Sequence, residues 1–155
     1  MPLPIAGYAT ATFTPAAAAY SANDVISVAQ EFNGLSAPLG GIMTIVKTVL
    51  QIAHTALIAS EAGYVLHLYS VTPPSAHADN AAWDLPSGDR AVYLGEVNLG
   101  TPIDVGSTLR IEQNGIQQQI KVPSNVGGGT IWGELVTVGG FTPTAAARTV
   151  ELFTA

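Results

Sequence analysis

Turn-forming residues recur along the chain at short intervals, and this punctuation is the feature that most limits the possible folds. They occur as pairs or runs at Asn33-Gly34, Gly40-Gly41, Pro73-Pro74, Ser87-Gly88, Asn114-Gly115, 127–129 and Gly139-Gly140. The segments between them are short and rich in β-branched and aromatic residues, which is typical of strands. The pattern therefore predicts an all-β fold, an antiparallel β-sandwich of the jelly-roll-like type.

The expected strands cover residues 24–31, 42–53, 64–71, 92–99, 130–138 and 149–153. Residues 64–71 are apolar on both faces, which suits a central strand that is covered on either side or at an oligomer interface. Residues 42–60 contain no proline or glycine, so a helix is possible there, although their β-branched residues favour one or two strands.

The segment TLRIEQNGIQQQIKV predicts a β-hairpin. Asn114-Gly115 supplies two residues that accept positive φ, as a two-residue type I′ turn requires. In that register Leu109 faces Ile120, and Ile111 lies on the same side of the ribbon.

The first twenty residues differ from the rest because they contain Pro2, Pro4, Pro15 and an alanine run. Proline fixes φ and lacks a backbone donor, so residues 1–20 are predicted to form an extended N-terminal arm, and residues 21–155 the sandwich domain. The arm is either a frayed terminus or a segment ordered against a neighbouring subunit. In the second case Ile5, Tyr8 and Phe13 are its expected anchors.

Charged residues make up only 10% of the chain, against about 25% in a typical soluble domain. A surface with so little charge repels its neighbours weakly, which suits a chain that works in contact with others. The net charge of −6 and the scatter of the five basic residues argue against nucleic-acid binding, which needs a basic stripe.

The sequence has no cysteine, which excludes disulfides, thiolate nucleophiles and cysteine-ligated zinc. The first residues lack a basic stretch followed by an apolar one, so no secretory signal is expected. The most apolar stretch is interrupted by Lys47, Gln51 and His54, which makes a membrane span unfavourable. We therefore expect a soluble protein synthesised in a cytoplasm.

The run AHADNAAWDLPSGDR, residues 76–90, concentrates charge in this lightly charged chain. Its acids and His77 do not have the spacing of a calcium loop or a zinc helix, so no metal is expected. The sequence contains no G-x-S-x-G elbow and no phosphate-binding loop, so neither a catalytic residue nor a cofactor is nominated. Two interpretations remain open: a loop stapled by its own tryptophan, or a partner-binding loop using Trp83, Asp84 and Arg90.

Roughly residues 64–144, more than half of the chain, contain the block LHLYSVTPPSAHADNAAWDLPSGDRAVYLGEVNLGTPIDVGSTLRIEQNGIQQQIKV and then GELVTVGGFTPT. In these blocks, and most specifically in the run DNAAWDLPSGDR, the chain resembles a family of small virion proteins of tailed bacteriophages. These proteins resemble structural components encoded among head genes. The resemblance therefore implies a capsid decoration or cement role in the virion, made in the cytoplasm of a bacterial host, and it carries over no catalytic residue.

The first hypothesis is thus a non-enzymatic protein that binds the outer surface of the major capsid protein and reinforces the head. Closed symmetry, with a trimer favoured, would multiply weak contacts by avidity. The alternative is a tail or fibre module in which Trp83 and Tyr69, beside Asp79 and Asp84, bind a host glycan. A small hydrolase is a third class, which the missing motifs disfavour.

Overall fold

The computed structural model describes residues 6–35, 41–121 and 129–155. Within these ranges the chain forms nine strands and no helix, which confirms the all-β prediction. The strands are β1 (Gly7–Phe13), β2 (Val25–Phe32), β3 (Ile42–Ile52), β4 (Tyr64–Tyr69), β5 (Tyr93–Gly100), β6 (Ile103–Asp104), β7 (Leu109–Lys121), β8 (Ile131–Thr137) and β9 (Arg148–Thr154).

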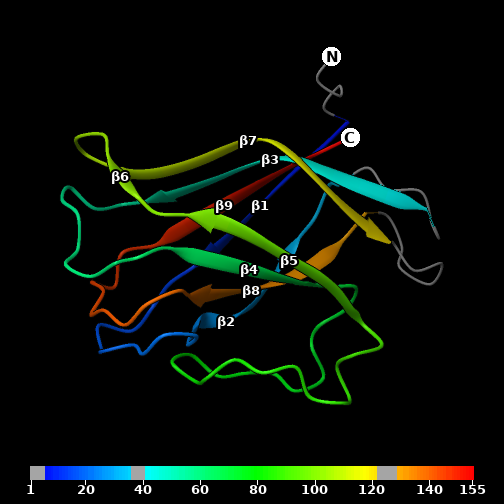
Figure 1. The fold of residues 1–155 in the computed structure, drawn as a ribbon, viewed down its shortest axis with the longest axis horizontal. Coiled ribbons are helices and arrows are strands. Elements are labelled where there is room, and N and C mark those ends of the chain that lie inside the picture. The colour runs from blue at the N-terminus through cyan, green and yellow to red at the C-terminus, as the bar shows by residue number, and fades with distance from the viewer. Residues whose placement is uncertain (1–5, 36–40, 122–128) are drawn as a thin grey trace.

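The strands form two antiparallel sheets that pack face to face (Figure 1). One sheet has five strands in the order β1-β9-β3-β7-β6, and the other has four in the order β2-β8-β4-β5. The chain therefore passes repeatedly from one sheet to the other. This interleaved order, with β6 as an added edge strand, is that of a jelly roll, so the predicted sandwich is confirmed.

Alternation along the strands builds the core between the sheets. In β9, Val150 and Leu152 are buried in the core, whereas Thr149 and Glu151 are half-buried on the outer side. The four-stranded sheet contributes Leu66, Leu68 and Leu135, among others, to the same core. The period of two residues that predicted strands from the sequence is therefore also the pattern that fills the interior.

A pair of oppositely charged side chains, Arg148 and Glu61, is buried in the interior. Arg148, at the start of β9, is fully buried. Its Nε donates to the Tyr64 hydroxyl at 3.1 Å, and its Nη2 lies 3.7 Å from the Glu61 carboxylate. The Tyr64 hydroxyl donates in turn to Glu61. These partners allow the buried guanidinium to remain in an apolar interior.

The predicted N-terminal arm is wrong for residues 7–13, which form a strand of the sandwich. Strand β1 is an integral edge strand that pairs with β9 from Gly7↔Thr154 to Phe13↔Arg148. Its alternating sequence GYATATF buries Ala9, Ala11 and Phe13 in the core. The prolines and the alanine run near this segment indicated an arm, although Tyr8, Thr10, Thr12 and Phe13 are residue types that favour strands. The sandwich therefore includes part of the region assigned to the arm, and Ile5 lies outside the described residues.

The predicted hairpin is also wrong, because β7 continues as one strand through Asn114-Gly115. It runs antiparallel to β3, with Lys47 opposite Asn114 and Ile45 opposite Gln118. One residue of β3 therefore faces three of β7, which is a bulge, and Gly115 supplies its positive φ of 71°. A bulge reverses the facing of the side chains just as a turn would, so the alternation could not distinguish the two.

Residues 42–60 form a strand and then a loop, so the helix alternative is wrong. Strand β3 spans 11 residues at the centre of its sheet, with β9 on one side and β7 on the other. Because of the bulge, Met43 and Ile45 are buried before it, and Thr48, Leu50 and Ile52 after it. This segment therefore forms a strand, as its β-branched residues predicted.

The β4–β5 loop, residues 70–92, is the long connection that lies along the outside of the four-stranded sheet (Figure 1). It also runs along β2, because the Val25 amide donates to the Ala81 carbonyl and the Asn80 amide to the Val25 carbonyl, both at 2.8 Å. The loop therefore covers an edge strand that would otherwise present free backbone groups. It contains the charged run that the sequence singled out.

Candidate functional site

Trp83 fastens the β4–β5 loop to the sheet beneath it. Its ring stacks on the His67 ring of β4, with centroids 3.6 Å apart and planes 13° from parallel. Its Nε1 donates to the Tyr69 hydroxyl at 3.0 Å and to Glu134 Oε2 at 3.1 Å. Of the two interpretations of the charged run, the structure confirms the loop stapled by its own tryptophan.

Glu134, on β8, is the buried acceptor at the centre of this contact. It is fully buried on the outer face of the sheet. Besides the indole, its carboxylate accepts the Tyr69 hydroxyl at 3.0 Å and lies 3.1 Å from His77 Nδ1. Charge-assisted hydrogen bonds from several donors offset the cost of removing a carboxylate from water.

His77 links this buried carboxylate to an exposed one. Its Nε2 lies 3.0 Å from Asp84 Oδ1, and the Asp84 side chain is 74% exposed. Burial lowers the pKa of His77, but the hydrogen bonds to Asp84 and Glu134 outweigh it and raise the pKa above its usual 6.5. The imidazolium form, with a proton on each nitrogen, can donate to both acids at once.

His67 has the opposite electrostatic environment. Burial, with a smaller contribution from the charge of His77, lowers its pKa to about 4. Its Nδ1 lies 3.0 Å from the Tyr93 hydroxyl of β5. At neutral pH His67 is therefore an uncharged ring that packs under Trp83, as expected for a structural histidine.

Asp79 forms a second attachment, between the loop and the segment before β2. Its carboxylate accepts the Tyr20 hydroxyl at 2.6 Å, the Ser27 amide at 2.5 Å and the Ala16 amide at 3.2 Å. Burial and the bond to Asp79 raise the pKa of Tyr20, which keeps this hydroxyl a donor. Ser27 has a positive φ of 66°, so Asp79 also holds a bent backbone in β2.

Asp89 closes the loop on itself. It is 1% exposed and accepts the Ser75 amide at 3.0 Å, together with the Ser75 hydroxyl. Three acids of the loop, Asp79, Asp84 and Asp89, thus all bind groups of their own chain. The acids that suggested a metal or partner site are structural contacts in this fold.

The predicted partner-binding residues are dispersed. Trp83 donates to Glu134, Asp84 lies against His77, and Arg90 is exposed in the same loop. Tyr8 is exposed on β1, where its ring lies 5.0 Å from that of Phe153. Phe13 is fully buried in the core, so its role as an anchor on a neighbouring subunit is wrong.

Sequence reasoning missed Glu134, which lies 57 residues from His77 along the chain. The available signal was one acid within the otherwise uncharged strand sequence IWGELVT. An acid whose neighbours on both sides are buried is unusual unless it has donors nearby. No spacing rule, however, connects it to the loop.

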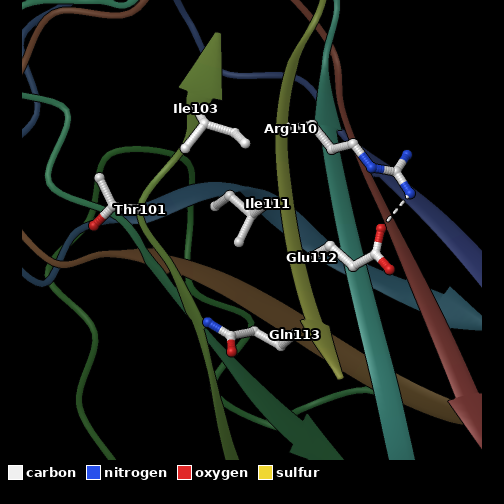
Figure 2. Close-up of a pocket in the computed structure, with 6 residues that line it drawn as sticks. All are labelled: Thr101, Ile103, Arg110, Ile111, Glu112 and Gln113. Carbon is white, nitrogen blue, oxygen red and sulfur yellow. Dashed lines mark hydrogen bonds and ion pairs between the residues drawn. The ribbon is translucent and has the colours of Figure 1, made fainter. Parts of the chain in front are cut away.

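A small hollow lies beside β7, away from this loop (Figure 2). It has a volume of about 250 Å³, which is below the roughly 300–1,000 Å³ of common ligand pockets. Arg110 and Glu112 on its rim are paired at 2.8 Å. The lining residues are Thr101, Ile103, Arg110, Ile111, Glu112 and Gln113.

Within the described ranges, no three histidine or acidic side chains are grouped so that they could hold a metal ion. The same part of the chain forms no helix long and apolar enough to cross a membrane. No family model matches the sequence, and no curated protein is detectably similar to it.

Proposed function

We propose that the protein is a non-enzymatic structural protein of a tailed-bacteriophage virion. It decorates the head by binding the outer surface of the major capsid protein, as a homo-oligomer for which a trimer is favoured, and it stabilises the shell. The observation that carries this proposal is the resemblance over residues 64–144, in particular the run DNAAWDLPSGDR.

The contacts of that run support a structural role. Asp79, Trp83 and Asp89 belong to it, and each binds groups of its own chain through short hydrogen bonds or ring stacking. A sequence whose most specific residues hold a loop flat on a sheet suits a rigid body that is carried on a larger assembly. A catalytic loop would instead direct such side chains toward a substrate.

The jelly-roll order is a second, weaker support. Viral capsid proteins and lectins both use this architecture, so it fits a virion protein but does not assign a function by itself. The low charge of the chain also suits a surface that remains in contact with a shell.

The two aromatic residues of the glycan-binding alternative are unfavourably placed for it. Tyr69 is fully buried, and one face of the Trp83 ring is covered by His67. Sugar recognition by stacking needs an accessible aromatic face. The geometry therefore favours the decoration role over a tail or fibre lectin.

Heads prepared with and without the protein provide the test. We expect heads that lack it to release DNA at a lower temperature, or after milder chelator treatment, and purified protein to restore their resistance. Equal release from both kinds of head would contradict reinforcement. Cryo-electron microscopy of the virion gives an independent check, because density for the protein at the tail tip would contradict a position on the head.

A further inference from the structure

Four connections meet at one end of the sandwich, which we call the loop end. They are residues 14–24, 53–63, 101–108 and 138–147, and they lie on the left in Figure 1. Backbone contacts join them into one surface. The Val138 amide donates to the Gly63 carbonyl at 3.0 Å, and the Ala53 amide to the Ala147 carbonyl at 3.3 Å.

Hydrogen bonds also attach the other two connections. The Thr101 hydroxyl donates to the Ala62 carbonyl at 2.6 Å. Tyr20 and Phe141 exchange two backbone hydrogen bonds, at 2.9 and 3.1 Å. The loop end is therefore a continuous and firmly held surface.

This end exposes aliphatic side chains. Of the eight large apolar residues exposed in the described ranges, half lie here. They are Leu57 (56% exposed), Ile103 (61%), Val105 (53%) and Val138 (48%). Together they come from three of the four connections, and the fourth adds the exposed alanine run 16–19. Such a gathering marks a surface that another molecule covers.

The same end is almost free of charge. The four connections contain no lysine or arginine, and their acids are Asp24, Glu61 and Asp104. Asp24 and Glu61 are buried, so Asp104 is the one exposed charge on a surface of four loops. Depletion of charge is characteristic of the centre of protein interfaces.

The absence of charge at the loop end indicates which kind of partner can bind there. In a closed symmetric assembly of identical chains, each copy presents the same kind of patch to the axis, so like charges there are brought together. In a chain with a net charge of −6, a neutral face is the one on which copies meet with the least repulsion. A partner of a different chemistry held by charge would need ionic groups, which this end does not offer.

We propose that the loop end is the surface through which copies of this chain associate, by closed rotational symmetry and through Leu57, Ile103, Val105 and Val138. This inference does not depend on the proposed role in a phage head. It differs from the sequence-based expectation, which placed subunit contacts on the N-terminal segment and the Trp83 loop.

Substitution of single exposed residues tests the proposal. Light scattering and sedimentation should show that the wild-type chain is an oligomer, and that Val105→Asp and Leu57→Asp each weaken its association by about tenfold or more. Val28→Asp is the matched control, because Val28 is 51% exposed within β2, outside the four connections. The control should leave association unchanged, and thermal unfolding should be the same for all three variants because the altered side chains are exposed.

The proposal is overturned if the wild-type chain is a monomer at every concentration, or if the loop-end variants associate as the wild type does. It is also overturned if Val28→Asp dissociates the oligomer equally. A monomeric wild type whose Val105→Asp variant loses binding to heads would assign this end to the shell instead of to a second copy. That result would contradict self-association while supporting the decoration role.

Discussion

The β4–β5 loop and the loop end use side chains in opposite ways. The β4–β5 loop is rich in acids, and Asp79, Asp84 and Asp89 all bind groups of the same chain. The loop end is joined mainly by backbone hydrogen bonds and exposes aliphatic side chains to solvent. In this lightly charged protein, charge therefore marks where a long loop has to be held, and its absence marks the surface that is free for contact.

The largest effect is expected on removal of Glu134, the buried acceptor on β8 that binds the β4–β5 loop. Glu134→Ala leaves Tyr69, Trp83 and His77 without their common acceptor, so we expect a loss of about 3–5 kcal/mol in the free energy of unfolding. Urea denaturation measures it. Glu31→Ala, at an exposed position on β2, is the control and should change stability by less than about 0.5 kcal/mol. If Glu134→Ala and Glu31→Ala changed stability equally, Glu134 would contribute no more than a surface acid, and the β4–β5 loop would not depend on a buried acceptor.

The next effect concerns the pH dependence of His67. Its pKa falls from the usual 6.5 to about 4 in the folded chain, so the folded state favours the neutral ring. The associated stability is fully present above pH 6.5 and is lost as the pH falls toward 4, by about 3 kcal/mol. We expect His67→Gln to remove this slope in urea titrations at several pH values. If the free energy of unfolding varied with pH in the same way for the wild type and for His67→Gln, the burial of a neutral histidine would be contradicted.

His77 should show the reverse sign. Because its folded pKa is raised, its contribution is complete below its usual pKa and is lost as the pH rises through the raised value. His77→Asn should therefore cost more stability at pH 5 than at pH 9. A cost that does not vary with pH would show that the charge of His77 does not hold the loop.

Trp83→Ala should have a smaller effect, of about 2–3 kcal/mol, because the half-buried indole contributes ring stacking and one donor. Trp83→Phe retains the stacking and should lose about 1 kcal/mol. Proteolysis within residues 70–92 gives the local measurement, with faster cleavage expected for the alanine variant. Resistance equal to that of the wild type would mean that Trp83 is not the staple.

The smallest effect is expected at the loop end. The exposed carboxylate of Asp104 accepts the Gly106 amide at 2.8 Å and has no other bond in the structure's described part. Asp104→Asn should therefore change the free energy of unfolding by less than about 0.5 kcal/mol in the same urea assay. A loss as large as that of Glu134→Ala would remove the contrast between the two regions.

The sequence predicted the strands of the sandwich well where turn residues bounded them. It failed at Asn114-Gly115, because a turn and a bulge both need positive φ and both reverse the side-chain alternation. It also failed at β1, where nearby prolines and an alanine run outweighed the strand-forming Tyr8, Thr10, Thr12 and Phe13. In both cases the local pattern was correct, but the partner strand decided the structure.

The contacts of the loop were predictable only in part. The indole of Trp83 in a polar loop indicated that its ring packs against another surface. That surface was predicted to be either the sheet of the same chain or a partner protein. The site is completed by Glu134 and His67, which lie on other strands. Sequence spacing carries no information on such contacts, because the fold alone brings these residues together.

Hydrogen exchange of the isolated protein tests most directly whether the β4–β5 loop is held by its own sheet. The amide of Asn80 donates to the Val25 carbonyl of β2, and that of Trp83 to the Asn23 carbonyl just before β2, both at 2.8 Å. We predict slow exchange at both amides in the free chain, and little change when heads are added. Rapid exchange in the free chain, with protection appearing only on heads, would show that the loop is a partner-binding segment and would contradict this account.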